Sequence, residues 1–469
     1  MASDGDTVER LQQYLRELAP AARTLLVGEL ERGLLRGDDV AGADLVLQEL
    51  RRLMRESDRP PPRIGNAARL FFKPLEPFLV DDVAEHKHPG RIARVTLEPI
   101  WTWIRRDLLP DAAKEFSDEV SKALLADDGP QAELLTRAFQ DMVAQNIEQA
   151  FTVAQADEKA RRRMIAQIGT PRGSDDAAGM LRVLKARDAL DALSTRLPGH
   201  IHNLADERLD NAKALVDTCA NRNPEILLYA LLVVMSRLAA PWQLIRLATK
   251  AADSDLADRV ADTSYAVVVT IVLAEVERLV GELKSDLKSG RGIAVTTLLK
   301  IIHDAARGLR TEMDLSVDSA WARQLAALRA QISELLKAEI ESMPGRVRRL
   351  LRPRPSTEIR AGSALDAGDV AEVEALIEFV GACRSFGGEL AISEMTQRTY
   401  SELQQYLDTT TRALLDGLRH AGQGDRAFRQ SQVDAAVRFS GKAFGKEYSS
   451  LLSKASDVAA NSERQAAKA

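Results

Sequence analysis

The most apolar stretches of the chain are Ile226-Leu-Leu-Tyr-Ala-Leu-Leu-Val-Val-Met235 and Tyr265-Ala-Val-Val-Val-Thr-Ile-Val-Leu-Ala274, near the middle of the sequence. Each run has ten residues and no charge, and the amphipathic stretch 241–250 lies between them. A bilayer span needs about 18 or more consecutive apolar residues, so both runs are too short to cross a membrane. We therefore expect them to form the buried centre of the protein.

Both runs are predicted to be helical. Asn223 followed by Pro224 is a strong start signal for the first run, because it places a capping side chain before a proline in the first turn. The second run is rich in valine, which also suits a β-strand. It continues without turn residues into Glu275-Val-Glu-Arg-Leu-Val-Gly-Glu-Leu-Lys284, and this continuity favours a helix.

The composition extends this prediction to the whole chain. The chain has 469 residues, which is longer than one ordinary domain and long enough to bury a substantial core. Aromatic residues make up only 4% of the chain, so Leu, Val, Ile and Ala must supply most of the core volume. Strong helix formers dominate. The predicted fold is all-α, with roughly 15 helices packed antiparallel around a central apolar helix pair and no significant β-sheet.

Charge and cysteine usage exclude several classes of protein. The chain has 64 basic and 69 acidic residues, a net charge of −5, and no arginine run with aromatic stacking partners, so specific nucleic-acid binding is not expected. The first ten residues are acidic where a signal peptide is basic and then apolar. Cys219 and Cys383 lack the spacing of a metal site. We expect a cytoplasmic protein with two reduced thiols.

Breaks in the helical pattern suggest a division of the chain. Three consecutive prolines at 60–62 end a helix, and six arginines between Arg346 and Arg360 accompany further prolines. Between these breaks, one helix is expected from Pro130 to about Ile168. The predicted parts are an N-terminal helical hairpin (1–57), a Pro- and aromatic-rich segment (58–110), a central helical body (111–345), an Arg/Pro-rich linker (346–364), a C-terminal helical unit (365–458) and a terminal tail (459–469).

The segment from Phe71 to Arg106 has the most unusual local composition. Leu-Glu-Pro occurs in it twice, and Pro77 and Pro99 are each expected to begin a helix. Trp, Phe and Arg are the residues enriched at binding hot spots. The candidate partner-binding residues are Phe71, Phe72, Phe78, Trp101, Trp103, Arg105 and Arg106.

Two other interpretations of this segment are open. Trp101 and Trp103 followed by Arg105 and Arg106 also suit a membrane–water boundary, with the rings at headgroup level and the cations near phosphate. Alternatively, the aromatic residues form a compact buried subcore. The two tryptophans point about 200° apart on a helix, so a single neighbouring helix cannot bury both. We therefore expect one of them to meet a second layer or a partner.

Two His-x-His pairs, His86/His88 and His200/His202, are candidate metal ligands. In an extended chain this spacing places both rings on one side, which suits a metal ion. Both pairs lie beside Pro-Gly, where solvated histidines also collect. The sequence 441–447 resembles a phosphate-binding loop only superficially, because it has one residue too few between its glycines and Glu447 where Ser or Thr is needed.

The sequence favours a non-enzymatic helical scaffold or protein-interaction protein. It would bind an unidentified protein partner through exposed helical faces and the segment Phe71–Arg106. No catalytic residue and no cofactor is expected. Peripheral membrane association through Trp101/Trp103 and Arg105/Arg106 is the first alternative, and a metal-binding protein or enzyme that uses the histidine pairs is the second.

Overall fold

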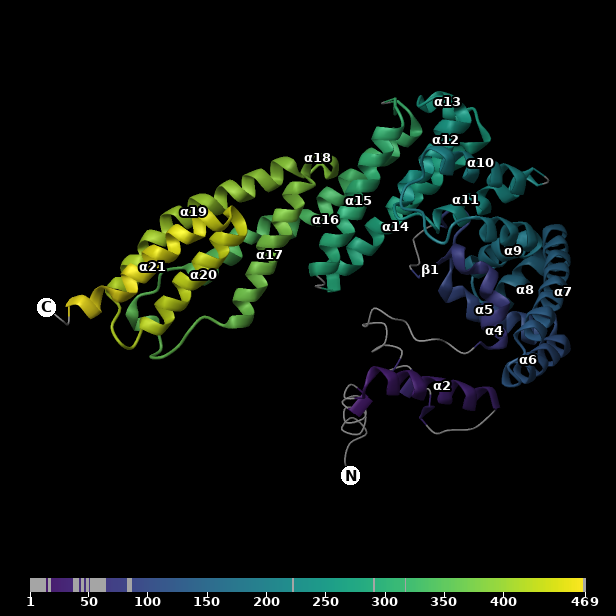
Figure 1. Ribbon diagram of the computed structural model, residues 1–469, viewed down its shortest axis with the longest axis horizontal. Helices are drawn as coiled ribbons and strands as arrows, with labels where there is room; N and C mark the ends of the chain where they lie inside the picture. The colour runs from purple at the N-terminus through teal and green to yellow at the C-terminus, as the bar shows by residue number, and fades with distance from the viewer. Residues whose placement is uncertain are drawn as a thin grey trace. The chain divides into compact units, whose positions relative to one another are not determined.

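The computed structural model shows an all-α protein (Figure 1), and the predicted class is confirmed. The structure describes residues 14–15, 18–36, 42–43, 46–47, 50, 65–81, 87–221, 223–289, 292–316 and 318–466. Within these ranges there are 19 α-helices and one two-stranded parallel sheet, in which β1 (Leu79–Val80) pairs with β2 (Ile92–Ala93). No helix in the described ranges is both long enough and apolar enough to cross a membrane.

The described residues fall into two compact units. The first is drawn from Met1–Leu197 and Leu215–Val233, and the second from Pro198–Ala214 and Val234–Ala469. The two apolar runs belong mainly to different units, since 227–233 lies in the first and 265–274 in the second. Most residues of both runs are buried. The six-part division expected from composition stays a prediction.

Helices α2 and α4 to α9 and three short helical turns build most of the described part of the first unit. Helix α7 packs against α4, α6, α8 and α9, and so lies at the centre of this group. The bounds are α2 (Pro20–Arg36), α4 (Ala67–Phe72), η1 (Lys73–Phe78), η2 (Arg94–Thr96), α5 (Leu97–Trp103), η3 (Ile104–Leu108), α6 (Pro110–Leu125), α7 (Gly129–Ala156), α8 (Glu158–Ile168) and α9 (Pro171–Arg196).

Helices α10 (Asp206–Ala220) and α11 (Leu227–Met235) span the boundaries between the residue ranges of the two units. The start of α11 follows the sequence prediction. The Asn223 side chain accepts a hydrogen bond from the backbone N–H of Glu225 at 3.0 Å, and Pro224 opens the turn η4 (Pro224–Ile226) that leads into the helix. This cap satisfies a donor that the helix itself leaves unpaired.

The second unit contains the longest of the described helices, α16, and a continuous apolar core. Its bounds are η5 (Pro241–Leu244), α12 (Ile245–Ala252), α13 (Ala257–Ala261), η6 (Ser264–Ala266), α14 (Val267–Ser289), α15 (Gly292–Glu312), α16 (Ala320–Leu351), η7 (Ser356–Glu358), α17 (Ala367–Ser385), α18 (Gly387–Leu390), α19 (Ser393–Arg419), α20 (Arg426–Phe444) and α21 (Lys446–Ala466). Helices α16, α17, α19 and α20 pack side by side as a bundle (Figure 1). The core extends from Val276 on α14 to Ala459 on α21. The valine-rich run is helical, as predicted.

The linker expected at 346–364 begins inside α16, so its first six residues are helical. This helix continues through Pro344 and ends at Leu351. A proline inside a helix removes a backbone donor and costs about 3 kcal/mol. Met343 and Val347 are both fully buried in the core of the second unit. Packing on both sides of the proline therefore outweighs the local penalty, which the sequence pattern alone does not show.

Arginines that were expected in the linker join helices of the bundle instead. Arg346 on α16 forms an ion pair with Glu372 on α17. Arg348, also on α16, lies 2.5 Å from Glu402 on α19. These side chains are 37–57% exposed, so each pair contributes only about 0–1 kcal/mol of stability, and the pairs mainly favour one arrangement of neighbours.

The helix expected from Pro130 to Ile168 is interrupted at Asp157. This residue is extended (φ −134°, ψ 114°), and its side chain accepts a hydrogen bond from the backbone N–H of Lys159 at 2.9 Å, which caps α8. Gly169, with φ 99°, ends α8 where the sequence predicts a stop. The prediction of one helix was wrong because a local cap competes with a continuous apolar face.

The repeated Leu-Glu-Pro motif does not begin a helix at both of its prolines. Pro77 lies near the end of the turn η1, which stops at Phe78 before β1. Pro99 is the third residue of α5 and so lies in its first turn. The prediction holds approximately for Pro99 and is wrong for Pro77.

Candidate functional site

Aromatic side chains of the predicted partner-binding segment lie in the interior of the first unit. The ring centroids of Phe71, Phe72 and Trp101 are between 5.0 and 5.9 Å apart, and none of these side chains is more than 8% exposed. Phe116 on α6 and Phe139 on α7 stack on each other at 4.3 Å, and Phe139 lies 5.6 Å from Phe71. We call these five residues the aromatic core. Such ring pairs stabilise a core beyond the area that they bury.

Phe78 and Trp103 are also buried, at 0% and 2% exposure. Phe78 meets Tyr229 edge to face at 5.3 Å. Helix α5 carries both tryptophans and packs against α8 and α9, and the ring of Trp101 lies 6.3 Å from that of Phe139 on α7. The expectation that a partner or a membrane surface contacts the rings of this segment is therefore corrected. The helices of the first unit cover these rings themselves.

Arg105 and Arg106 differ from the aromatic members of the predicted set, since both are exposed. They lie on η3, a single π-helical turn after α5. Arg106 forms an ion pair with Asp107 at 2.7 Å and donates a hydrogen bond to the carbonyl of Gln167 at 3.3 Å. A partner could therefore reach the cations of this segment but not its rings.

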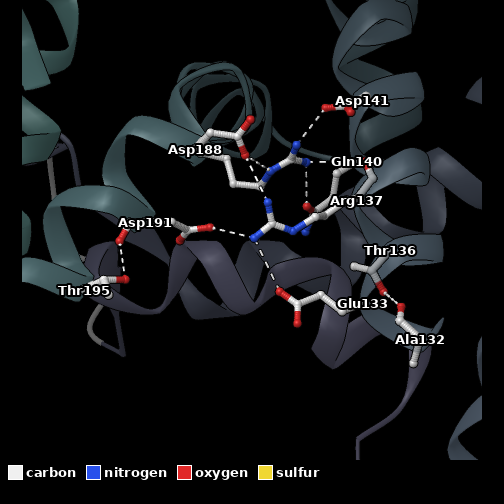
Figure 2. A network of polar contacts seen from close by, with 10 residues as sticks. Ala132, Glu133, Thr136, Arg137, Gln140, Asp141, Asp188, Asp191 and Thr195 are labelled. Carbon is white, nitrogen blue, oxygen red and sulfur yellow. Dashed lines mark hydrogen bonds and ion pairs between the residues drawn. The ribbon is translucent and has the colours of Figure 1, made fainter. Parts of the chain in front are cut away.

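A polar network joins α7 to α9 beside the aromatic core (Figure 2). Arg187 is 7% exposed, and it forms an ion pair with Asp141 at 3.2 Å. Its guanidinium also donates to the side-chain oxygen of Gln140 at 2.9 Å. The Gln140 amide donates in turn to the carbonyl of Phe71 at 2.8 Å. The network therefore fixes the backbone at Phe71 relative to α7 and α9.

Arg137 is the second cation of this network (Figure 2). It lies 3.2 Å from Asp188, 3.3 Å from Asp191 and 3.4 Å from Glu133. Burial raises the pKa of the Asp191 carboxyl above its ordinary value, although Arg137 opposes this effect. Each carboxylate has a cationic neighbour, so the arrangement is best explained as a set of ion pairs that links α7 to α9.

The histidine pairs have different surroundings. His86 lies outside the described residues, and His88 is 4% exposed. His200 and His202 are exposed, and their rings meet edge to face with centroids 4.4 Å apart. The expectation that the spacing places both rings on one side is confirmed for this pair. Among the residues that the structure describes, no three or more His, Cys, Asp or Glu side chains gather closely enough to hold a metal ion.

A pocket of the second unit lies between residues 238–242 and helices α14 and α15. Its volume is about 290 Å³. Val272, Val276 and Leu279 of α14 form an apolar floor, and each is at most 6% exposed. Ile301 of α15 lines the pocket and is 41% exposed. Sites for drug-sized molecules have volumes of about 300–1,000 Å³, so this pocket suits one large side chain or a small ligand.

The rim of this pocket is charged. Arg278 lies 2.9 Å from Glu275 and 3.0 Å from Glu282. Burial lowers the pKa of its guanidinium, but the two carboxylates outweigh burial and raise that pKa above its ordinary value. Asp304, also on the rim, lies 3.1 Å from the ring of His303. Glu275, Asp304 and Arg278 line the pocket, so its lining has two carboxylates and one guanidinium and a net charge of −1.

The indole of Trp242 forms one wall of the pocket and rests on Gly308 of α15. A Cβ atom at position 308 would lie 2.3 Å from the indole ring, which is closer than real Cβ atoms approach their neighbours. The guanidinium of Arg246 lies 5.4 Å from the centroid of the ring, within cation–π distance. The glycine therefore fixes how deeply the tryptophan can sit.

We expect Gly308→Ala to displace the indole and to lower the free energy of unfolding by about 1–3 kcal/mol, the usual cost of overpacking. Thermal unfolding and the tryptophan emission maximum would measure the two effects. Gly281→Ala on α14 is the matched control, because nothing lies within 4 Å of its added methyl group. It should stabilise the chain by about 0.5–1 kcal/mol. Equal stability of the two variants would contradict this packing.

Sequence reasoning missed the pocket, because its lining comes from three segments that are distant in the chain. Two signals were present. Trp242 follows Pro241 between the apolar runs, and Glu275, Arg278 and Glu282 have the i,i+3 and i,i+4 spacing of helical ion pairs. Neither signal shows that α15 packs against α14 and the segment that contains Trp242.

Comparisons of the chain with protein-family models, with curated proteins and with solved structures found no match. The function is therefore inferred from the geometry of the site.

Proposed function

We propose that the chain is a non-enzymatic helical interaction protein that holds an apolar anchor residue of a partner protein in the pocket beside α14 and α15. The observation that supports this proposal is the apolar floor of the pocket next to the exposed Ile301. Anchor residues at the centre of an interface typically fill such pockets and carry most of the binding energy. The volume of about 290 Å³ fits one anchor residue.

The charges of the rim favour one kind of partner. Glu275 and Asp304 line the pocket together with one guanidinium, that of Arg278, so a basic side chain next to the anchor would find complementary charge. An amphipathic helix offers this combination, with an apolar residue and a Lys or Arg three or four positions away. The proposed partner segment is therefore a basic amphipathic helix.

The pocket can be blocked by a single substitution. Ala239 lines it and is exposed, so a large side chain at this position can enter the pocket without disturbing the core. We expect Ala239→Trp to weaken capture of the partner from cells of the source organism roughly thirtyfold, since an anchor contributes about 2 kcal/mol or more. Quantitative mass spectrometry of the captured proteins would measure the loss.

Ala326→Trp is the matched control, because Ala326 is an exposed alanine of α16 that does not line the pocket. It should capture the same partner as the unmodified chain. If both variants capture it equally well, or both lose it equally, the pocket is not the binding site. Circular dichroism of the two variants would establish that each remains folded.

A further inference from the structure

The segment that carries His200 and His202 is extended and is paired on both sides of its central residue. Ile201 forms a parallel bridge with Leu238. Its N–H donates to the carbonyl of Arg237 at 2.7 Å, and its carbonyl accepts from the N–H of Ala239 at 2.9 Å. The Ile201 side chain is 3% exposed. Because side chains alternate along an extended chain, both flanking imidazoles point away from the core and towards solvent.

Contacts after the pair hold this backbone in place. The buried Gln243 amide donates to the carbonyl of His202 at 3.0 Å, and its side-chain oxygen accepts from the N–H of Leu204 at 2.7 Å. Arg246 donates to the side-chain oxygen of Asn203 at 2.7 Å. The two histidines are therefore held on a braced segment, which reduces the entropy that a bound ligand would have to remove.

The positively charged Arg246 lies near His200 and His202, but an ion pair reduces its repulsion of a bound cation. Arg246 is the guanidinium tied to this segment through Asn203, and it also lies 2.6 Å from Glu312. Both side chains are about one fifth exposed. The ion pair balances the positive charge of the arginine close to the imidazoles.

The centroid separation of the rings is close to that of two imidazoles on one metal ion, and rotation of the two exposed side chains out of their edge-to-face contact would direct one nitrogen of each at the ion. With metal–nitrogen distances of about 2.0–2.1 Å, two imidazole centroids lie about 4.5 Å apart at a right angle at the metal and about 5.2 Å apart at a tetrahedral angle. The observed separation is 4.4 Å. Right angles belong to square-planar and octahedral ions, and imidazole ligands with these geometries suit Cu²⁺ and Ni²⁺.

We propose that His200 and His202 form a two-histidine chelate for a divalent transition-metal ion of the Cu²⁺ or Ni²⁺ type. The two imidazoles supply adjacent positions around the ion, and water completes the coordination. This proposal is independent of the partner pocket, because neither histidine lines it.

Titration calorimetry of the full-length, tag-free chain with Ni²⁺ tests the proposal. We expect one ion per chain at this site. His200→Ala and His202→Ala should each weaken binding roughly a hundredfold, because either change removes the second arm of the chelate. The double variant should bind Ni²⁺ more weakly than either single variant, because no imidazole remains at the site. His420→Ala, which removes an exposed histidine elsewhere in the second unit, should bind Ni²⁺ as the unmodified chain does.

Several outcomes would overturn the proposal. One is that His200→Ala and His202→Ala leave the affinity for Ni²⁺ unchanged. Another is that the pair binds two Ni²⁺ ions in the unmodified chain and one in each single variant, which would mean two independent single-histidine contacts. A third is that binding is lost in a His86→Ala/His88→Ala variant but kept in the other variants, since this result would assign the ion to the other pair.

Discussion

Val268→Asp should prevent the second unit from folding. Val268 lies in the valine-rich run at the start of α14 and is fully buried. A carboxylate there would have to be buried without a partner or be protonated, and such changes typically cost more than about 4–5 kcal/mol. A folded chain is stable by only about 5–15 kcal/mol. We expect low soluble yield, loss of helical circular dichroism and rapid proteolysis of residues 234–466.

The control for Val268→Asp introduces the same residue on the same helix. Lys284 is an exposed position of α14, and Lys284→Asp should change the free energy of unfolding by no more than about 0.5 kcal/mol. A Val268→Asp chain with the helical signal and melting temperature of the unmodified protein would show that the valine-rich run is not at the core.

Trp101→Ala should destabilise the first unit by about 3–5 kcal/mol, the usual cost of removing a buried aromatic ring. Trp101 is 5% exposed, and its ring lies 5.3 Å from Phe71 and 6.3 Å from Phe139. Its removal leaves a cavity between α5, α6 and α7. Denaturant unfolding followed by circular dichroism would measure the loss.

Arg105→Ala separates this effect from a role at the surface. Arg105 lies on the same segment and is exposed, so its removal should change the free energy of unfolding by no more than about 0.5 kcal/mol. If Trp101 and Trp103 instead bound a membrane surface, removing a ring would weaken membrane binding and leave the stability unchanged. If Trp101→Ala is as stable as the unmodified chain but no longer floats with liposomes, the ring acts at a membrane and not in the aromatic core.

Local signals in the sequence predicted many helix ends correctly. Asn223 with Pro224 starts the first apolar helix, and Gly169 ends α8, because capping and left-handed backbone depend on a few adjacent residues. Asp157 was a similar local signal that we missed. Pro344 shows the opposite case, because buried neighbours carry α16 through a residue that normally ends a helix.

The burial of the aromatic segment could not be read from its composition. Core rings and interface hot spots use the same residue types, so Phe71 and Trp101 suit either setting. The difference lies in Phe116 and Phe139, which come from α6 and α7 and cover the rings. A sequence without known contacts does not show which distant helix supplies such neighbours.

The pocket depends in the same way on contacts between distant segments. Its floor on α14 and its exposed edge at Ile301 on α15 each look like an ordinary part of an amphipathic helix. The opening exists only because residues 238–242 cross beside both helices and Trp242 rests on Gly308. The His200/His202 geometry was easier to predict, because the side-chain alternation of an extended chain is local.

Site-specific photo-crosslinking tests whether the pocket beside α14 and α15 holds the partner. A photoreactive phenylalanine analogue in place of Ile301 would lie at the edge of the pocket, and the same analogue in place of Ala326 would lie on an exposed face of α16. We predict a specific crosslink from position 301 to a basic amphipathic helix of one partner, its loss in the presence of Ala239→Trp, and no such product from position 326. Crosslinking of the same protein with equal yield from both positions, or from 326 alone, would contradict the assignment of the pocket as the partner-binding site.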